Sequence, residues 1–293
     1  MSGKRIKKHH FVPKVLQKAF CSDGDHIWFS SRDHESRFGA VEDRNIESTF
    51  RVKDLYTILD GNEKLSDVIE RMFYGRIDDY LGRILPEVLD CLGRGEVPVF
   101  SRESLDGLRR VVYEMIKRTP EFTGRFDDLE IGTNFIQGIR DHLREYPDLE
   151  QQAFCEEVLL DETKLRHFGR SIKVRGLVQK SDLVYDAIAK FEPRWAVING
   201  KHSFILSSLI AYRVGNGGPN GLANPKMEIW MPIAPKYALV MLRDPEGRIP
   251  LRVEESRDHV RQINEYAVKN SSHVASHSHK LLISLIGHGG LSK

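Results

Sequence analysis

The spacing of hydrophobic residues divides the chain into three parts. Between residues 65 and 89, apolar residues recur at steps of three and four, which is typical of one face of an amphipathic helix. The same period continues through 122–143, 149–160 and 165–191, and Ser101 is a suitable N-cap for a helix that runs to Lys117–Pro120. The middle of the chain, residues 64–191, is therefore predicted to be helical, with a disturbance at Pro86.

Short β-rich runs flank this helical part. Turn signals punctuate residues 1–60, and β-rich runs recur over 194–254. Asn199-Gly200 predicts a hairpin between the runs "RWAVI" and "KHSFILS". The last segment, 256–293, is predicted to be a closing helical segment. We expect a single α+β domain over 1–293, with short N-terminal β-elements, a central helical region and a C-terminal antiparallel β-sheet with a closing helix.

Composition indicates an ordinary globular protein. Hydrophobic residues make up 40% and charged residues 29% of the chain. Cys21, Cys91 and Cys155 are few and far apart, which argues against a disulfide framework and favours a reducing compartment. Prolines and a lysine interrupt the most apolar late stretch, so no membrane span is predicted. We expect a cytoplasmic protein with no membrane partner.

Positive charge is distributed unevenly along the chain. The formal net charge is only +2, yet residues 1–20 contain six cations, including Lys4, and no acid. A second acid-free basic stretch covers 164–180. In the helix predicted there, three cations fall on one face. The residues predicted to bind nucleic acid are Lys7, Lys8, Lys14, Arg166, Arg170 and Lys173. The alternative for both stretches is a solvated surface.

Several segments, in order, resemble a known family. They are "HHFVPKVLQKAF" from His9, "FRVKDLYTI", "VIERMFYGRIDDYLGRIL", "VVYEMIKRTPEF", "RWAVINGKHSFILSS", "EIWMPIAPKYALVM" and "INEYAVKNSSHVASH". Together they are similar to the bacterial DUF4238 family, whose function is not settled, over most of residues 8–280. The resemblance implies Gln where this chain has Lys14, and Asp where it has Ser208. If that aspartate serves catalysis in relatives, this chain has lost the acid or reassigned its role.

The opening "HHFVP" carries the first candidate chemistry. Val12 precedes a proline and favours extended backbone, so His9 and His10 are expected to point to opposite faces. One imidazole is then a candidate general acid or base. The alternative is that both rings hydrogen-bond backbone groups. Arg118, before Thr119-Pro120, is a candidate clamp for a phosphate or carboxylate, or simply a cation at a helix C-terminus.

Three further positions complete the candidate chemistry. Glu70 borders the apolar stripe of the first long helix and is a candidate metal ligand or base, or a solvated flank. Asn264, in the closing helix, is a candidate for orienting a histidine or substrate. His273, His277 and His279 have spacing seen in metal sites, but no nearby carboxylate completes a known pattern, so no metal site is predicted. The sequence assigns no cofactor and no oligomeric state.

Two functions from different classes fit these residues. The first is a nuclease-like phosphodiester hydrolase, in a bacterial defence or toxin component, with a histidine moving the proton. The second is a non-catalytic module that binds nucleic acid or another anion, which the absence of an aspartate at position 208 favours. A protein-interaction scaffold with structural histidines is the third alternative, so enzyme status stays open.

Overall fold

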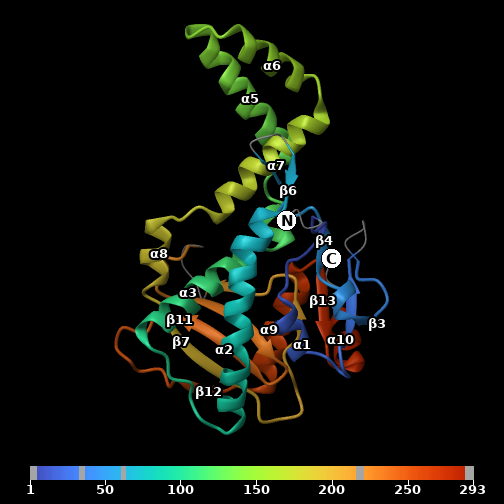
Figure 1. Cartoon of the computed structure of the whole chain (residues 1–293). Helices are drawn as coiled ribbons and strands as arrows, with labels where there is room; N and C mark the ends of the chain where they lie inside the picture. The colour runs from blue at the N-terminus through green and yellow to red at the C-terminus, as the bar shows by residue number, and fades with distance from the viewer. Residues whose placement is uncertain (1–4, 33–36, 61–63, 216–220, 288–293) are drawn as a thin grey trace. The chain divides into compact units, whose positions relative to one another are not determined.

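The computed structural model describes residues 5–32, 37–60, 64–215 and 221–287 (Figure 1). Lys4, counted above in the basic opening, lies outside these residues. Within them, short N-terminal strands precede a helical region, an antiparallel sheet and closing helices. The predicted α+β class is confirmed.

The chain divides into two compact units, each assembled from three segments. Unit 1 comprises Met1–His9, Val52–Arg76 and Thr123–Gln179. Unit 2 comprises His10–Arg51, Ile77–Phe122 and Lys180–Lys293. Two short strands, β1 (Lys8–His10) and β4 (Arg51–Lys53), pair in a two-stranded sheet, and the chain crosses from one unit to the other within each of them.

Unit 1 is built mainly from three helices (Figure 1). Helices α5 (Asp128–Glu145), α6 (Leu149–Leu159) and α7 (Glu162–Val178) each begin after an aspartate that accepts backbone N–H bonds. Strands β5 (Ile58–Leu59) and β6 (Leu65–Ser66) and the π-helical turn η2 (Glu70–Tyr74) complete it. The buried side chains shared by the three helices are Ile136, Leu143, Cys155, Val158 and Leu165.

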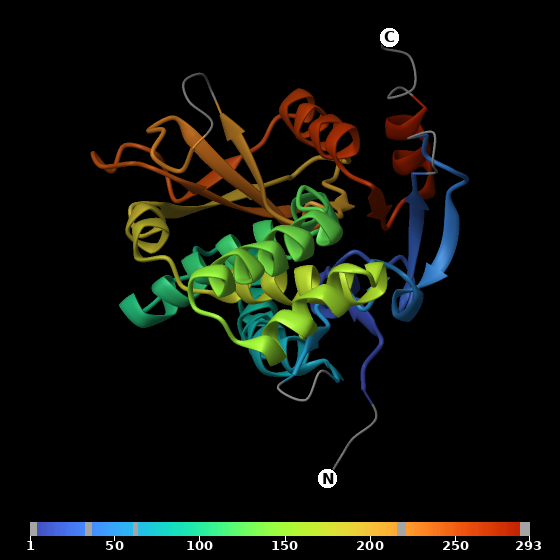
Figure 2. The same cartoon turned by 90° about the horizontal axis from the view of Figure 1, so that it is seen from above.

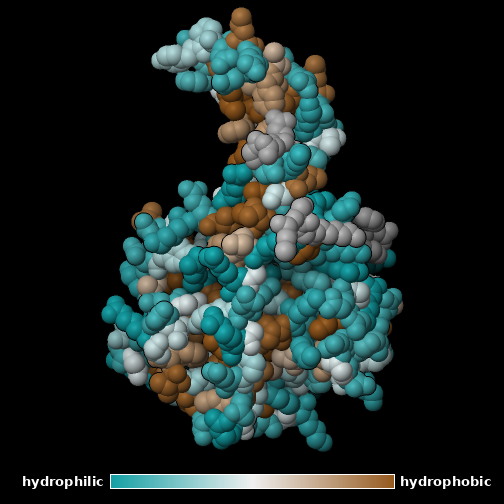
Figure 3. All heavy atoms as spheres, in the orientation of Figure 1, coloured by the Kyte–Doolittle hydropathy of each residue, from teal (hydrophilic) through white to brown (hydrophobic). Residues whose placement is uncertain are grey.

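The core of these helices is small, and apolar side chains remain on their surface. Figure 3 shows brown side chains among teal ones over this part of the chain. Phe135, Tyr146, Leu149 and Leu160 are among the exposed large hydrophobic residues. Close backbone packing therefore contributes much of the contact between these helices.

Helices α5 and α7 approach each other at two glycines. A Cβ atom built on Gly132 would lie 2.0 Å from the carbonyl oxygen of Leu165, and one on Gly169 would lie 1.8 Å from that of Asp128. Only hydrogen fits at either position, so the two backbones touch directly. This contact compensates for the cost of placing glycine inside a helix.

Unit 2 contains two sheets. The five-stranded sheet has the order β12-β7-β11-β10-β9, and Figure 2 shows its strands, coloured from gold to orange. The four-stranded sheet has the order β3-β2-β13-β8. The strands are β2 (His26–Ser31), β3 (Glu42–Asn45), β7 (Glu192–Val197), β8 (Leu206–Ser207), β9 (Tyr212–Gly215), β10 (Met227–Ala234), β11 (Tyr237–Leu242), β12 (Arg252–Glu254) and β13 (His273–Ser276). Nearly every residue of β10 and β11 is buried, as their continuous apolar runs require.

Helices accompany these sheets in unit 2. They are α1 (Lys14–Ala19), the 3₁₀ helix η1 (Ile46–Ser48), α2 (Gly75–Gly93, in unit 2 from Ile77), α3 (Arg102–Lys117), α4 (Pro120–Thr123), α8 (Asp182–Ile188), α9 (Arg257–Asn270) and α10 (His279–Ile286). Ser101 caps α3, as predicted, by accepting a bond from the Ser104 N–H. Helix α2 continues through Pro86, where a disturbance was expected; the irregular turn lies earlier, at η2.

The hairpin predicted around Asn199-Gly200 does not form. Strand β7 pairs with β11 and β12, whereas β8 pairs with β13 in the other sheet. The Ile198 N–H and the Phe204 N–H bond to the carbonyl groups of Lys236 and Pro235 instead of to each other's strand. The turn between β10 and β11 satisfies these backbone groups, and this tertiary pairing overrides the local turn signal.

The closing segment contains a strand as well as helices. Residues 273–276 form β13, which lies between β2 and β8. The helical prediction for 256–293 therefore holds for α9 and α10 but not for β13. Among the described residues, no helix is long and apolar enough to cross a bilayer.

We expect Gly169→Ala to lower the free energy of unfolding of unit 1 by about 2–3 kcal/mol, because the added methyl group forces α5 and α7 apart. Gly176→Ala, on an exposed turn of the same helix with open space around its Cβ, is the matched control. It is expected to stabilise α7 by up to about 1 kcal/mol. Urea unfolding and amide exchange of α5 and α7 measure both. Equal effects of the two variants would contradict the direct backbone contact.

Candidate functional site

A polar cluster in unit 2 gathers residues from three separate parts of the chain. It consists of Glu121, Ser208, Ser272 and His273, and is called the Glu121 cluster below. The Glu121 Oε1 atom accepts bonds from the Ser272 N–H and the Ser272 hydroxyl, both at 2.7 Å, and from the Ser208 hydroxyl. The Ser208 hydroxyl oxygen also accepts the N–H groups of Ser272 and His273 at 3.0 and 3.2 Å.

The Arg-Thr-Pro motif places Glu121 in this cluster. Helix α3 ends at Lys117, and Arg118 is its C-cap. Pro120 starts the short helix α4, a position where proline is favoured because its missing N–H is not needed. The Thr119 hydroxyl accepts the Phe122 N–H at 3.2 Å. This change of direction brings Glu121 to the start of β13.

Arg32 fixes the segment that carries Ser272. Its guanidinium donates to the carbonyl oxygens of Val268, Lys269 and Ser271 at the end of α9. The Arg32 N–H also donates to the Ser272 carbonyl at 2.8 Å. A cation at this helix C-terminus satisfies carbonyl groups that the helix leaves unpaired. Helix α9 therefore ends in a defined position, and β13 starts directly after it.

The hydrogen bonds define the proton positions on His273. An ionised Glu121 can only accept, so the Ser272 hydroxyl proton points to it. The Ser272 oxygen, 2.7 Å from His273 Nδ1, must then accept a proton carried by Nδ1. The neutral ring therefore has a free electron pair on Nε2, for which no hydrogen-bond partner is found among the described residues.

Aromatic rings enclose His273. The centroids of Phe11, Phe29 and Phe50 lie 5.6, 5.7 and 6.3 Å from that of the imidazole. Burial lowers the pKa of His273, and the Glu121 charge opposes this shift. His273 is therefore neutral near pH 7 and able to accept a proton at Nε2.

Two strained residues flank the cluster. Phe50 has a φ of 47°, and Ile210, two residues after Ser208, has a φ of 52°. A β-branched residue at positive φ is a marked outlier, because its side chain collides with the backbone. Such strain concentrates at functional sites. Two of the three non-glycine residues with positive φ among those described thus lie beside His273 and Ser208, and the third, Asp54, lies in unit 1.

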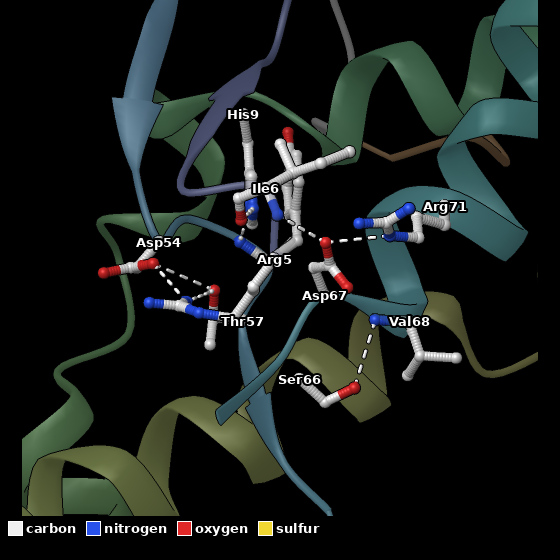
Figure 4. A network of polar contacts seen from close by, with 10 residues as sticks. Arg5, Ile6, His9, Asp54, Thr57, Ser66, Asp67, Val68 and Arg71 are labelled. Atoms are coloured by element: carbon white, nitrogen blue, oxygen red, sulfur yellow. Dashed lines mark hydrogen bonds and ion pairs between the residues drawn. The ribbon is translucent and has the colours of Figure 1, made fainter. Parts of the chain in front are cut away.

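His9 lies in unit 1 and is fully buried (Figure 4). Its Nδ1 accepts the Tyr56 N–H at 2.9 Å, and its Nε2 lies 3.0 Å from the Ile6 carbonyl, so Nε2 carries the proton. The ring stacks on Tyr56 at 5.6 Å. Burial lowers the pKa of His9. Both nitrogens are thus occupied by backbone groups, and a catalytic role of His9 stays a prediction.

The network in Figure 4 holds the segment that leads to His9. Arg5 donates to Asp54 at 2.5 Å and to Thr57 at 3.1 Å. Asp67 accepts the Ile6 N–H at 2.6 Å and also pairs with Arg71. Arg5, one of the six cations in residues 1–20, is therefore part of a structural network in unit 1.

Arg118 and His10, both in unit 2, meet through the backbone of His10. The Arg118 guanidinium is fully buried, donating to Asp78 at 2.5 Å and to the His10 carbonyl at 2.8 Å. His10 is half-buried, and its Nε2 lies 3.3 Å from the Ile46 carbonyl. Arg118 therefore joins α3, α2 and β1. Its proposed contact with a substrate phosphate is untested.

Glu70 and Asn264 are not members of the Glu121 cluster. Glu70 starts the π-helical turn of unit 1. Asn264 is buried in unit 2, where its side chain accepts the Ile205 N–H and donates to the Ser203 carbonyl at 3.1 and 2.9 Å. Asn264 thus holds the segment that enters β8, and the catalytic assignment of both residues stays a prediction.

Carboxylates accompany most of the cations predicted to bind nucleic acid. Arg166 pairs with Glu162, and both Arg170 and Lys173 pair with Asp128. Lys14 pairs with Glu47 at 2.6 Å. The remaining two predicted residues, Lys7 and Lys8, are exposed. The three cations on this face of α7 thus share two carboxylates within unit 1.

The described residues contain no group of three or more His, Cys, Asp or Glu side chains arranged to hold a metal ion. The Glu121 cluster has one carboxylate, and two hydroxyl groups fill the space around its Oε1 atom. Among the described residues, therefore, two hydroxyl groups and the Ser272 N–H occupy the Oε1 atom of this carboxylate.

Sequence reasoning overlooked three members of the cluster or gave them other roles. Glu121 follows directly after the Arg-Thr-Pro motif and was passed over in favour of Arg118. His273 was considered only for its spacing to two other histidines. The run Asn270-Ser-Ser-His273, which ends a helix and starts a strand, is the signal that was available. Pairing it with Ser207-Ser208 required the sheet order of unit 2.

These features define an α+β protein in which four motif segments converge. Phe11 of "HHFVP" packs on the His273 ring, and the charge of Glu121 of "RTPEF" acts on that ring. The Ser208 hydroxyl accepts the His273 N–H. The chain belongs to the family described as "Protein of unknown function (DUF4238)", whose model matches residues 8–280. No curated protein and no solved structure matches the chain.

The buried histidine His9 predicts a pH dependence of stability. Its pKa is lowered from the usual 6.5 in the folded protein, so the unfolded chain binds more protons near that pH. The free energy of unfolding should therefore fall as pH falls through 6.5. Urea unfolding at a series of pH values measures this fall, and His9→Gln should reduce it. His142→Gln, at an exposed position of α5, is the control and should leave the pH dependence unchanged.

Proposed function

We propose that this protein is a nuclease-like phosphodiester hydrolase in which His273 is the general base. The observation that carries the proposal is the hydrogen-bond chain from His273 Nδ1 through the Ser272 hydroxyl to Glu121, with Nε2 left to accept a proton. A carboxylate that orients a histidine through its Nδ1–H is a recurrent catalytic arrangement. Here the Ser272 hydroxyl is placed between the two groups.

The chemical step requires little beyond this arrangement. A water molecule attacks phosphorus, and Nε2 of His273 takes its proton. The P–O bond to the leaving group breaks, and the leaving oxygen is protonated from solvent. Glu121 and Ser272 act as positioning residues, since they hold the ring and stabilise its positive charge when it is protonated.

Arg44 supports an anionic substrate. Its guanidinium lies 5.3 Å from the centroid of Phe29, whose ring packs on His273, and its charge acts on His273. Its partner is Glu42, and 41% and 52% of the two side chains are exposed. Exposed ion pairs contribute about 0–1 kcal/mol, so a phosphate can replace Glu42 at low cost.

A second candidate function is a non-catalytic module that binds nucleic acid. The observation that favours it is Ser208, which stands where the family resemblance leads us to expect an aspartate. Its hydroxyl leaves the described cluster with Glu121 as its one carboxylate. In this case the same region binds an anion without cleaving it.

We expect purified protein to cleave RNA or DNA, and His273→Gln to lower the rate by about 10²–10⁴-fold. Labelled RNA and single- and double-stranded DNA are incubated with Mg²⁺, Mn²⁺ or EDTA. Ser272→Ala should lower the rate and change the pH profile, because the ring loses its link to Glu121. His277→Gln, at a half-buried histidine beyond the end of β13, is the matched control and should keep the activity.

The same experiment separates the alternatives. Loss of cleavage in His9→Ala or His10→Ala, with His273→Gln still active, would identify a histidine of the "HHFVP" segment as the general base. That result would contradict the assignment of His273. Salt-sensitive binding without cleavage under any condition would identify the binding module. Circular dichroism of each variant establishes that the fold is intact.

A further inference from the structure

The strands β1 and β4 place His10 opposite Arg51. The Phe11 N–H donates to the Phe50 carbonyl, and the Asp54 N–H donates to the Lys7 carbonyl. Residue numbers rise along one strand where they fall along the other, so the two strands are antiparallel. With Phe11 opposite Phe50, the preceding pair across the ribbon is His10 and Arg51. These two basic residues of unit 2 are thus direct neighbours.

The two faces of this pair differ sharply. Phe11 and Phe50 are fully buried and pack on His273. Since side chains alternate along a strand, His10 and Arg51 point to the other side, and both are half-buried. Their position makes them a feature separate from the Glu121 cluster.

Positive charge is left uncompensated on this face. Lys14 also acts on His10, but Lys14 is paired with Glu47 at 2.6 Å. The side chain of Arg51 has no hydrogen bond or ion pair with any other described residue. The charges of Lys14 and Arg51 oppose protonation of His10, so a positive charge on the ring is costly here without an anion.

We propose that Arg51, His10 and Lys14 form a binding site for a phosphate group. The site goes beyond the proposed hydrolase centre, because it lies on the opposite side of the Phe11–Phe50 pair and holds its ligand without cleaving it. The guanidinium of Arg51 presents paired N–H donors that match two phosphate oxygens. The Nζ atom of Lys14 leaves its ion pair with Glu47 and binds the phosphate instead.

His10 adds a proton to the binding reaction. Its Nε2–H donates to the Ile46 carbonyl, so neutral His10 presents an electron pair on Nδ1, which repels an anion. Burial first, then the charges of Lys14 and Arg51, lower its pKa, while Glu47 opposes them. Arg118 acts on the His10 carbonyl rather than on the ring. A bound anion therefore raises the pKa of His10, and by linkage the anion binds more tightly as pH falls.

Two sources supply this ligand chemistry: a free phosphate, or the backbone of a nucleic acid. Inorganic phosphate and a single-stranded oligonucleotide are the two arms of the test. Sulfate serves as the probe for the pH arm, because it stays doubly charged where phosphate itself titrates. If the ligand is nucleic acid, loss of Arg51 should reduce the dependence of oligonucleotide affinity on salt by about one unit of slope.

The experiment follows the His10 ring by NMR during titration of the full chain with sulfate. We expect the pKa of His10 to rise and Arg51→Gln to weaken sulfate binding about tenfold, the loss of one charge-assisted bond pair. Arg94→Gln is the control, because Arg94 is another arginine of unit 2 that is exposed and paired with Asp90 and Glu96. It should leave the affinity unchanged.

The outcome is decided without any measurement of cleavage. Sulfate binding that is equally strong in Arg51→Gln and in the wild type would overturn the site, as would an unchanged His10 pKa at saturation. His10→Gln should bind sulfate with no dependence on pH, and dependence that persists would contradict the role of His10. The absence of cleavage in the hydrolase assay would not affect the conclusion about sulfate binding. The absence of sulfate binding would likewise not affect the conclusion about the hydrolase.

Discussion

The carboxylate of Glu121 is the acceptor on which the Glu121 cluster depends. One oxygen atom receives a backbone N–H and two hydroxyl groups from segments that are 87 and 151 residues away in sequence. These bonds set the direction of the Ser272 hydroxyl, and that direction in turn sets the tautomer of His273. The strained backbone at Phe50 and Ile210 is tolerated beside this cluster because its packing and hydrogen bonds over-determine the local conformation.

Helical period and turn chemistry predicted much of the architecture. The steps of three and four in the middle of the chain correspond to α2, α3, α5, α6 and α7, and Ser101 caps α3 as its sequence suggests. Strand pairing was less predictable. The Asn-Gly signal at position 199 is local, whereas the partners of β7 and β8 are chosen by distant apolar strands. Strand β13 is four residues long, and its burial depends on β2 and β8, which no local pattern reveals.

The candidate site was predicted only in outline, for the same physical reason. The motifs around "HHFVP" and "RTP" do meet in unit 2, but the residues that meet are Phe11, Glu121 and the His10 carbonyl. The side chains of His9 and Arg118, which the motifs make conspicuous, are buried. His9 is bonded to backbone groups, and Arg118 to Asp78 and a backbone carbonyl. Alternation along β1 explains the difference between neighbours, since one strand directs His9 inward and leaves His10 at the surface.

The four-stranded sheet also controls when the protein can acquire its cluster during synthesis. Arg32, beside β2, bonds to Ser271, 239 residues later, and β2 itself pairs with β13. The first of these strands leaves the ribosome long before the second has been made. Until then β2 exposes an unpaired edge, and Ser272 and His273 do not yet exist in the nascent chain. The order of translation therefore delays formation of the cluster until the segment that carries Ser272 and His273 has been made.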